Sequence, residues 1–356
     1  MFLASDPQIT SMIAAGTPVA IGVSGGKDSQ AAVLSVFEHL DRVGHAGSRI
    51  LVHADLGTVE WRASLPVCQE LADHLGSELV VLRRRRGDLM DRWESRWQSS
   101  VTRYQDLSTV TLVPCWSTPS MRFCTSEMKT HPIDAMLKRR FPAQPIINVT
   151  GVRRAESRRR ARLTVADLSS DGRIWNWRPI LDWSEDEVFA CIARHGLEPH
   201  PAYRQFGMSR VSCRFCIMSS LPDLIAATRQ GEAHPLFRHL VSLECRSGFA
   251  FQGARWLGEV APQLLDRTER EQLADAKLRA AKRIEVESTI TADMLYVRGW
   301  PTRVLSDREA DTLASVRRVV TDLYGFRSSC LDRRSIQARY RELLSLRQSK
   351  IARSRP

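Results

Sequence analysis

The sequence predicts an α/β fold in which helices cover both faces of a mostly parallel sheet, followed by a helical C-terminal region. In the first part of the chain, short apolar runs alternate with stretches of helical periodicity. This alternation is typical of parallel strands joined by helical crossovers. From about residue 221 onward, strand patterns fade and long stretches rich in Ala, Leu, Arg and Glu remain. We therefore expect two domains, residues 1–220 and 221–356.

Each element is predicted from the spacing of its apolar residues and from the residues at its ends. Short apolar runs predict strands over residues 17–23, 50–54, 78–82, 146–150 and 175–180. Helical spacing predicts helices over residues 28–43, 65–75 and 128–140. Ser184 and Glu187 form a capping box, so another helix is expected to begin there and run toward His195. In the second domain we expect helices over residues 236–245, 263–285, 307–323 and 335–350.

The composition and charge of the chain exclude several protein classes. Of the 356 residues, 43% are hydrophobic, which is enough for a folded core. No apolar run reaches about 18 residues, and the N-terminus lacks a basic segment followed by an apolar one, so we expect a cytoplasmic protein without a membrane span. The net charge of +12 favours a polyanionic partner. Residues 331–356 add seven Arg and one Lys against one Asp and one Glu.

A glycine-containing loop between the first predicted strand and the first long helix is a candidate anion site. It consists of Ser24, Gly25, Gly26, Lys27, Asp28 and Ser29. Two glycines allow a tight turn whose N–H groups point into one concavity, and the following helix N-terminus adds partial positive charge. Lys27 adds a point charge, the serines add hydroxyl donors, and Asp28 suits either Mg²⁺ binding or helix capping. The alternative is an ordinary strand–helix turn; the spacing is not that of a Walker A loop.

This loop resembles that of the ATP pyrophosphatases, or PP-loop enzymes, which cleave ATP between its α and β phosphates. Further segments resemble motifs of the phosphoadenosine-phosphosulfate-reductase-like branch of these enzymes, in the expected order over about residues 15–220. They are His53-Ala-Asp-Leu-Gly57, residues 151–158, residues 179–188, and the stretch from Tyr203 to the paired cysteines near residue 216. The resemblance implies a Rossmann-like sheet of the adenine nucleotide alpha hydrolase type.

The same resemblance assigns ligand-binding roles to residues outside the loop. Asp55, at the carboxyl end of a predicted strand, is expected to bind Mg²⁺ or a ribose hydroxyl; the alternative is a simple turn. Gly151 opens the segment in which Arg153 and Arg158 are expected to bind phosphates, with Glu156 orienting them. Six arginines stand against one glutamate over residues 153–162. A solvated basic face is the alternative for this run.

Three of the eight cysteines are candidate metal ligands. Cys213 and Cys216 form a Cys-x-x-Cys pair, which is typical of a zinc half-site, a redox dithiol or half of an iron–sulfur site. Family members that thiolate nucleic acids hold a four-iron cluster on cysteines placed like Cys124, Cys213 and Cys216, so the resemblance favours a 4Fe-4S cluster. Three thiolates would leave one iron open to bind a sulfide; if there is a fourth ligand, Cys115 is the leading candidate and Cys245 the second. Zinc is the alternative metal, and burial of two core cysteines is the non-functional alternative.

Within this branch, the chain most resembles the ATP-pyrophosphatase component of DNA phosphorothioation systems. The resemblance implies that ATP and Mg²⁺ bind over the loop, with Ser24, Lys27 and Asp28 catalytic. A DNA backbone phosphate would accept AMP, and sulfur from the cluster, supplied by a cysteine desulfurase, would displace it. Other modification-system subunits are then expected partners.

Three alternative functions remain open at this point. A tRNA thiolation enzyme would use the same parts on a base. A phosphoadenosine phosphosulfate reductase would reduce a sulfonucleotide, although the C-terminal cysteine segment and the adjacent cysteine pair of such reductases are absent. A non-catalytic nucleic-acid-binding subunit would use the nucleotide only as a structural ligand.

Overall fold

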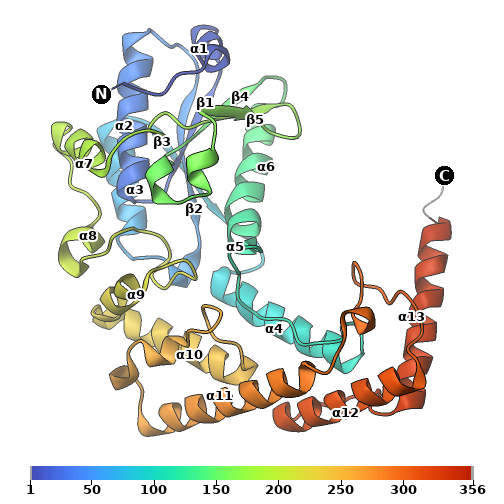
Figure 1. Cartoon of the computed structure of the whole chain (residues 1–356). Helices are drawn as coiled ribbons and strands as arrows, with labels where there is room; N and C mark the ends of the chain where they lie inside the picture. Colours follow the sequence, from blue (N-terminus) through green and yellow to red (C-terminus); the bar gives the residue numbers. More distant parts are fainter. Residues whose placement is uncertain (1, 354–356) are drawn as a thin grey trace. The chain divides into compact units, whose positions relative to one another are not determined.

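The computed structural model describes residues 2–353, which form two compact units (Figure 1). The first unit comprises Met1–Met90 and Pro119–Leu236, and the second comprises Asp91–Thr118 and Phe237–Pro356. These bounds differ from the expected domains in two places. Helix α9 (Leu221–Thr228) belongs to the first unit, and helix α4 (Leu89–Gln105), for which the sequence analysis made no prediction, lies almost wholly in the second.

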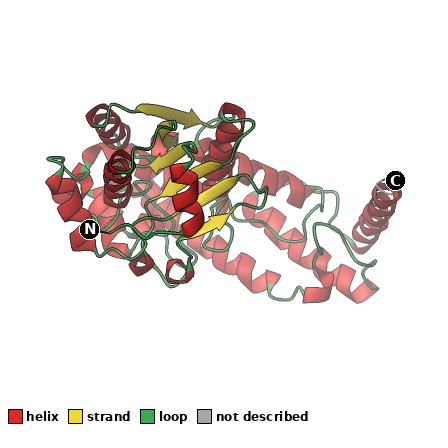
Figure 2. Ribbon diagram, turned by 90° about the horizontal axis from the view of Figure 1, so that it is seen from above, coloured by secondary structure: helices red, strands yellow, loops and turns green. Residues whose placement is uncertain are grey.

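The first unit is built on a sheet of six strands, counted within the described residues, in the order β3-β2-β1-β4-β6-β5 (Figure 2). All neighbouring pairs are parallel except β5 with β6. In register, Ile21 of β1 pairs with Leu51 of β2 on one side and Val149 of β4 on the other. The predicted fold class is therefore confirmed. The strands are β1 (Val19–Val23), β2 (Arg49–Asp55), β3 (Glu78–Arg83), β4 (Ile146–Thr150), β5 (Ala166–Leu168) and β6 (Ile174–Trp177).

Helices cover both faces of this sheet because its strands are apolar on both sides. Ile21 and Val23 belong to one buried cluster with residues of α1, α2, α3 and α7, whereas Ala20 belongs to a second cluster with residues of α6. The alternation follows from the two-residue period of a strand. The helices of this unit are α1 (Pro7–Ala14), α2 (Lys27–Arg42), α3 (Ser64–His74), α5 (Phe123–Thr125), α6 (His131–Arg140), α7 (Glu185–Arg194), α8 (Pro201–Phe206) and α9.

The strand order creates a position for a ligand at the carboxyl end of β1. The chain moves from β1 through α2 to β2 on one side, while β4 pairs with β1 on the other side. Such a switch in strand order is where open parallel sheets bind ligands. Short helical segments complete the first unit, and η1 and η3 follow strands β2 and β4. These segments are η1 (Gly57–Val59), the π-helical η2 (Ser126–Thr130), η3 (Arg154–Glu156), η4 (Arg160–Arg162) and η5 (Gly231–Ala233).

The second unit is helical, as the sequence predicts. Its core includes Leu313, Ile336 and Tyr340. Capping boxes at Asp266 and Ser306 fix the starts of two helices. Residues 354–356 of the basic C-terminal segment lie outside the described residues, and no helix in the described part is long and apolar enough to cross a membrane. The elements are α4, α10 (His234–Ser247), η6 (Leu257–Glu259), η7 (Pro262–Leu264), α11 (Arg267–Glu287), η8 (Ala292–Met294), α12 (Asp307–Tyr324) and α13 (Arg333–Arg353).

Candidate functional site

The loop between β1 and α2 is held in a tight turn by its own residues. Gly25 has a φ of +75°, in the left-handed region that favours glycine, and a Cβ there would lie 3.0 Å from the Ser64 carbonyl oxygen. The Ser29 hydroxyl donates to the carbonyl oxygen of Gly26 at 2.8 Å and accepts from the Ser24 N–H at 3.2 Å. These contacts fix the loop before any ligand is bound.

The loop presents backbone N–H groups that have no protein acceptor. The first N–H of α2, that of Lys27, donates to the Tyr203 hydroxyl at 3.0 Å. The N–H groups of Gly25, Gly26 and Asp28 make no hydrogen bond with any residue that the structure describes. Free N–H groups at a helix N-terminus, together with the partial positive charge there, form an anion site. The predicted anion-binding geometry of the loop is therefore present in its backbone.

A cavity of about 170 Å³ opens on this loop. Besides the loop, its walls come from the ends of β4 and α3 and from three segments that carry cations. Among the residues that line it are Ser24, Gly26, Asp28, Ser29, Gly151 and Glu156. The cations are Lys129, Arg160 and Arg210.

Two carboxylates of the cavity are already neutralised by arginines. Arg153 Nε donates to Asp28 Oδ1 at 2.5 Å, and the Arg153 N–H donates to Glu156 Oε2 at 2.9 Å. Glu156 also forms an ion pair with Arg160. Arg153 and Glu156, both predicted as site residues, thus contact each other and support the loop. Arg153 is buried and orients Asp28.

The cavity holds two cations without a carboxylate partner. Lys129, on η2, and Arg210, just before the paired cysteines, form no ion pair with any described residue. Their positive charge favours the thiolates of the cysteine pair, Lys129 that of Cys213 and Arg210 that of Cys216, and no described carboxylate neutralises it. An anion there would be attracted by both side chains and by the free N–H groups of the loop.

Lys27 lies elsewhere than expected. Its ammonium is buried, 3.0 Å from the Ser209 carbonyl oxygen and 3.1 Å from Glu185 Oε1, and it lies over the Tyr203 ring. Lys27 does not line the cavity. A carboxylate of α7 and a carbonyl group hold the side chain, so in this structure it anchors the loop to α7 and the segment after α8.

Asp55 and Arg158 are not brought to the cavity either. Asp55 Oδ1 accepts from the Gly57 N–H at 2.7 Å, and Arg83 Nε donates to Asp55 Oδ2 at 2.5 Å, so this carboxylate closes a turn at the end of β2. Arg158 is exposed and forms no ion pair with a described residue. The structure thus separates these two from the loop residues.

A buried histidine supports a third carboxylate of the cavity. Glu60 lines the cavity, and its Oε2 lies 3.2 Å from His53 Nε2. His53 Nδ1 lies 3.1 Å from the Val23 carbonyl oxygen and 3.6 Å from Cys68 Sγ. Burial disfavours the imidazolium, but the hydrogen bonds to Cys68 and Glu60 outweigh burial and raise the pKa of His53 to about 10. At neutral pH the imidazolium therefore compensates the Glu60 carboxylate.

Cys213 and Cys216 lie together in the loop between α8 and α9. Their thiols are hydrogen-bonded, and this bond lowers the pKa of Cys216, with the Met218 N–H 3.4 Å from its sulfur. Arg214 lies between them and is buried. Its backbone N–H donates to the Val59 carbonyl oxygen at 2.8 Å and so holds the loop in place. The pairing expected from the Cys-x-x-Cys spacing is present.

The four expected metal ligands lie in separate segments of the two units. Cys124 lies on α5 in the first unit. Cys115 belongs to the second unit, where its sulfur is fully buried near the Ser247 hydroxyl and burial raises the pKa of its thiol to about 12. Within residues 2–353, no three His, Cys, Asp or Glu side chains are placed to hold a metal ion. Two adjacent thiols do not fit a four-iron cluster, which needs at least three.

Three lining residues, Lys129, Glu60 and Arg210, were not predicted from the sequence, although the first two carry a signal. Lys129 ends the segment Arg122-Phe-Cys-Thr-Ser-Glu-Met-Lys129, and Glu60 follows the predicted strand at His53 by seven positions. Arg210 has no signal beyond its place before the cysteine pair. These side chains come from segments that are far apart in the sequence. They lie close together only because the strand order brings the segments to one cavity.

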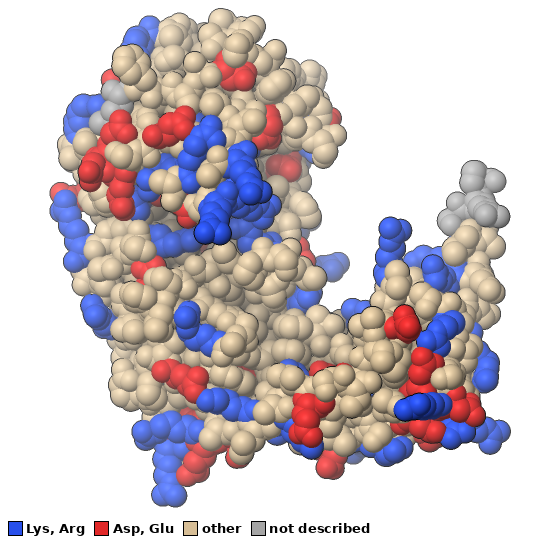
Figure 3. Space-filling view, in the orientation of Figure 1, with Lys and Arg blue, Asp and Glu red and all other residues tan. Residues whose placement is uncertain are grey.

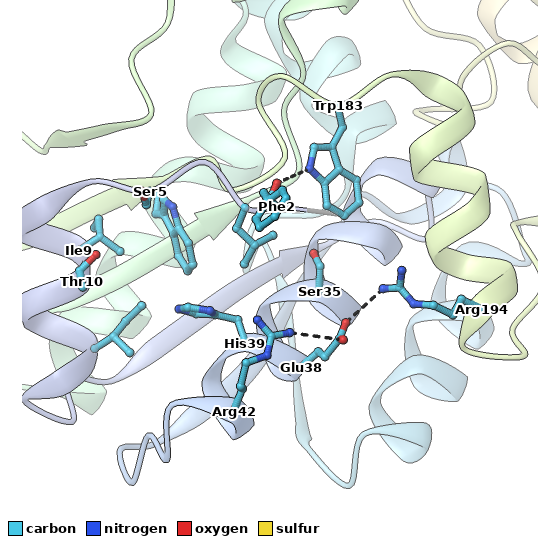
Figure 4. A pocket seen from close by; sticks show the side chains of 13 residues that line it. Phe2, Ser5, Ile9, Thr10, Ser35, Glu38, His39, Arg42, Trp183 and Arg194 are labelled. Carbon is cyan, nitrogen blue, oxygen red and sulfur yellow. Dashed lines mark hydrogen bonds and ion pairs between the residues drawn. The ribbon is translucent and has the colours of Figure 1, made fainter.

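A second cavity of the first unit, of about 230 Å³, lies apart from the loop between the N-terminal segment, α1, α2 and α7 (Figure 4). Trp183 Nε1 donates to the Phe2 carbonyl oxygen at 2.9 Å. Glu38 accepts from Arg42 and Arg194 at 3.4 and 3.1 Å. Because this carboxylate is paired within the cavity, and none of the predicted site residues lies there, the loop cavity remains the candidate site.

The chain matches known proteins mainly through its first unit. Residues 18–219 match the phosphoadenosine phosphosulfate reductase domain. An uncharacterized 37.8 kDa protein of Escherichia phage 186 is 28% identical over 249 residues, covering 57% of this chain and 68% of that protein. The adenosine 5'-phosphosulfate reductase of Neisseria meningitidis serogroup A is 32% identical over 100 residues. This match covers 28% of the chain and only 38% of the reductase.

Two solved structures are similar at low identity. The phosphoadenylyl-sulfate reductase of Candida auris, a phosphate complex, aligns with a TM-score of 0.36 and 13% identity, over 55% of this chain and 80% of that one. The U34-tRNA thiolase NcsA of Methanococcus maripaludis, with its [4Fe-4S] cluster, aligns with a TM-score of 0.38 and 14% identity, over 70% and 73%. The fold assignment rests on the sheet order itself.

Proposed function

The chain belongs to the phosphoadenosine phosphosulfate reductase domain family, and from this premise we propose that it is an ATP pyrophosphatase that transfers AMP to a DNA backbone phosphate, so that sulfur can replace a non-bridging oxygen there. One observation carries the proposal. Free N–H groups at the start of α2 and two unpaired cations, Lys129 and Arg210, converge on one cavity at the switch in strand order. This arrangement suits a polyphosphate better than a single neutral ligand.

The cavity offers a separate partner for each part of a bound triphosphate. The N–H groups of Gly25, Gly26 and Asp28 are placed to bind the phosphates that leave as pyrophosphate. Lys129 and Arg210 neutralise the charge that develops on them. Asp28 and Glu60 add carboxylate oxygens, the ligand type that Mg²⁺ takes alongside phosphates and water. When bound, Mg²⁺ would neutralise phosphate charge at this place.

The proposed reaction has two displacements at phosphorus. A non-bridging oxygen of the DNA phosphate attacks the α-phosphorus, a new P–O bond forms, and the bond to the β-phosphate breaks with loss of pyrophosphate. The free N–H groups of the loop stabilise the charge on this leaving group. A hydrosulfide-type nucleophile then attacks the activated DNA phosphorus, a P–S bond forms, and AMP leaves. A cysteine desulfurase is the proposed sulfur source, with a dithiol reductant that is oxidised to a disulfide as it releases the persulfide sulfur as hydrosulfide. Other modification-system subunits are proposed partners.

No step of this reaction is assigned to an iron–sulfur cluster, because no three ligand side chains of the described residues are placed to hold one. Cys213 and Cys216 remain suited to relay sulfur or electrons as a dithiol pair. Anaerobic purification with iron and sulfide quantitation distinguishes the two roles. Stoichiometric iron that is lost in Cys213→Ser would show that binding of a metal reorganises this loop and Cys124.

The test of the proposed function is pyrophosphate release from ATP in the presence of DNA and a sulfide donor. We expect AMP and pyrophosphate as products. In Lys129→Gln and Arg210→Gln, the rate should fall about tenfold or more, because each change removes a cation from the leaving-group site. Arg229→Gln, which changes an exposed arginine of the same unit, is the control and should retain the rate. Absence of pyrophosphate, or release of ADP in its place, contradicts the proposal.

A second candidate function is reduction of a sulfonucleotide. The identity with the Neisseria reductase and the adjacent thiols of Cys213 and Cys216 favour it. In that reaction a dithiol is oxidised to a disulfide while the sulfonucleotide is reduced to sulfite and AMP. Sulfite release from adenosine phosphosulfate with a dithiol donor, without any pyrophosphate release from ATP, would establish this function and exclude the first.

A further inference from the structure

The arginine run of residues 153–162 divides into two sets with different surroundings. One set is paired with carboxylates of the same unit. Its members are Arg153 with Asp28, Arg154 with Asp182 at 2.6 Å, and Arg160 with Glu156. These three arginines hold η3 and η4 against the loop and the segment before α7. Their charge is already neutralised.

The other set has no carboxylate partner. The side chains of Arg158, Arg159 and Arg162 are exposed and form no ion pair or hydrogen bond with any described residue. Figure 3 shows a gathering of Lys and Arg side chains over the η3 and η4 segment of the first unit. Like charges so close together repel one another unless an anion lies between them. The set therefore indicates a polyanionic ligand on this surface.

A shallow hollow of about 400 Å³ adjoins this set. Arg159 forms part of its lining, and the rest comes from residues 119–123, Thr125, Ser126 and Thr130. Met121, 54% exposed, offers an apolar contact, and the hydroxyls of Thr125, Ser126 and Thr130 offer hydrogen bonds. Apolar and hydroxyl groups beside unpaired arginines match the base, sugar and phosphate of a nucleotide.

The hollow and the loop cavity share two walls. Arg159, just before η4, lines the hollow, and Arg160, the first residue of η4, lines the cavity. At the end of η2, Thr130 lines the hollow and Lys129 lines the cavity. Consecutive residues of the same two segments thus open on the two depressions. The hollow and the cavity are therefore neighbours along these two segments.

Building on the proposed function, we propose that this hollow is the acceptor site for a single strand of nucleic acid. Phosphates of the strand contact Arg158, Arg159 and Arg162, and one unstacked nucleotide occupies the hollow. Its backbone phosphate then lies at the wall formed by Lys129 and Arg160, next to the α-phosphate of ATP. A single strand fits because its bases are free to leave the stack, whereas those of a duplex are not.

The test is binding of a fluorescein-labelled oligothymidine to the full chain, measured by anisotropy over a series of salt concentrations. Arg159→Gln/Arg162→Gln should lower the slope of log affinity against log salt by about 1.4, because each lost contact to a single strand contributes about 0.7. The control, Arg139→Gln/Arg229→Gln, changes two exposed arginines without a described ion-pair partner and should keep the wild-type slope. Met121→Ala should weaken binding at an unchanged slope.

The outcomes separate this surface from the proposed function. If the Arg159→Gln/Arg162→Gln variant keeps the wild-type slope, or if a duplex binds more tightly than the single strand, the acceptor site is overturned even when ATP is cleaved. If the slope falls as expected but no pyrophosphate is released, the surface stands and the proposed function fails. ATP binding without DNA should be the same in the variant and the wild type, which confirms that the variant is folded.

Discussion

Gly151 shows how one residue sets the geometry of the site. It follows β4, and a Cβ at this position would lie 2.4 Å from the Asp28 carbonyl oxygen and 2.8 Å from the Ser29 N–H nitrogen. Both neighbours are backbone atoms, so a side chain at residue 151 could be accommodated only by a shift of the loop backbone, which costs free energy. The missing side chain therefore lets the end of β4 reach the loop after β1.

Replacement of this glycine tests the close approach. Gly151→Ala should lower the free energy of unfolding by about 2 kcal/mol, because the loop must shift to admit a methyl group. Gly231→Ala is the control, since a Cβ at residue 231 would meet no atom within 4 Å. Urea denaturation measures both changes. If the two variants have the same free energy of unfolding, the loop backbone shifts without loss of stability and the close approach does not require a glycine.

At the same scale, the sequence predicted the loop but not every partner of its side chains. The glycines, the serines and Asp28 lie where the motif places them, because the strand–loop–helix pattern determines the local backbone. Lys27 could not be placed, because its ammonium is held by Glu185 and Ser209, which follow it by more than 150 positions. Long-range partners of this kind depend on packing.

Helix α8 depends on a buried histidine at its start. His200 is the N-cap, and its Nδ1 accepts the Ala202 N–H at 3.0 Å, so this nitrogen carries no proton. Burial lowers the pKa of His200 from 6.5 to about 4. Between these two values the unfolded chain binds a proton that the folded chain excludes. The free energy of unfolding must therefore decrease as the pH falls from about 6.5 to about 4.

A capping residue that does not titrate should remove this contribution. His200→Asn keeps a side-chain acceptor for α8, and the loss of stability between pH 6.5 and pH 4 should be smaller than in the wild type by about 2 kcal/mol. Urea denaturation at several pH values measures this change in the free energy of unfolding. His74→Asn, at an exposed position, is the control and should follow the wild-type profile. A wild-type pH profile in the His200 variant would contradict this account.

In the second unit, α12 is tied to α4 by a fully buried arginine. Arg317 Nε donates to the Cys330 carbonyl oxygen and Nη2 to the Tyr104 carbonyl oxygen, each at 2.8 Å, and the guanidinium lies over the Tyr104 ring. Arg317→Met would leave the Cys330 carbonyl oxygen buried without a described donor, whereas the Tyr104 carbonyl oxygen would keep only the Leu107 N–H. We expect a loss of about 3 kcal/mol in the free energy of unfolding.

The control for this prediction lies on the same helix. Arg308 is exposed, and its side chain forms no hydrogen bond with a described residue, so Arg308→Met should change the stability little. Calorimetry or denaturant titration of both variants makes the comparison. If Arg317→Met is as stable as Arg308→Met, the packing of the unit rather than these hydrogen bonds holds α12 against α4.

Over the whole molecule, the alternation of strands and helices predicted the parallel sheet, and the loss of strand patterns predicted the helical second unit. Both were readable because periodicity is a local property. That α4 belongs to the second unit could not be predicted, because the residues that α4 packs against are far away in the sequence. The same reason explains Cys115, which was expected as a further metal ligand with Cys124 although the two belong to different units.

The central claim is that the cavity on the loop binds the phosphates of ATP. Calorimetric titration of the full chain with ATP and with AMP, both with Mg²⁺, tests it most directly. We expect ATP to bind about tenfold or more tightly than AMP, since its extra phosphates meet the free N–H groups and the two cations. Lys129→Gln/Arg210→Gln should reduce the difference and leave only the contribution of the N–H groups. Equal affinity for AMP and ATP in the wild type would contradict the claim.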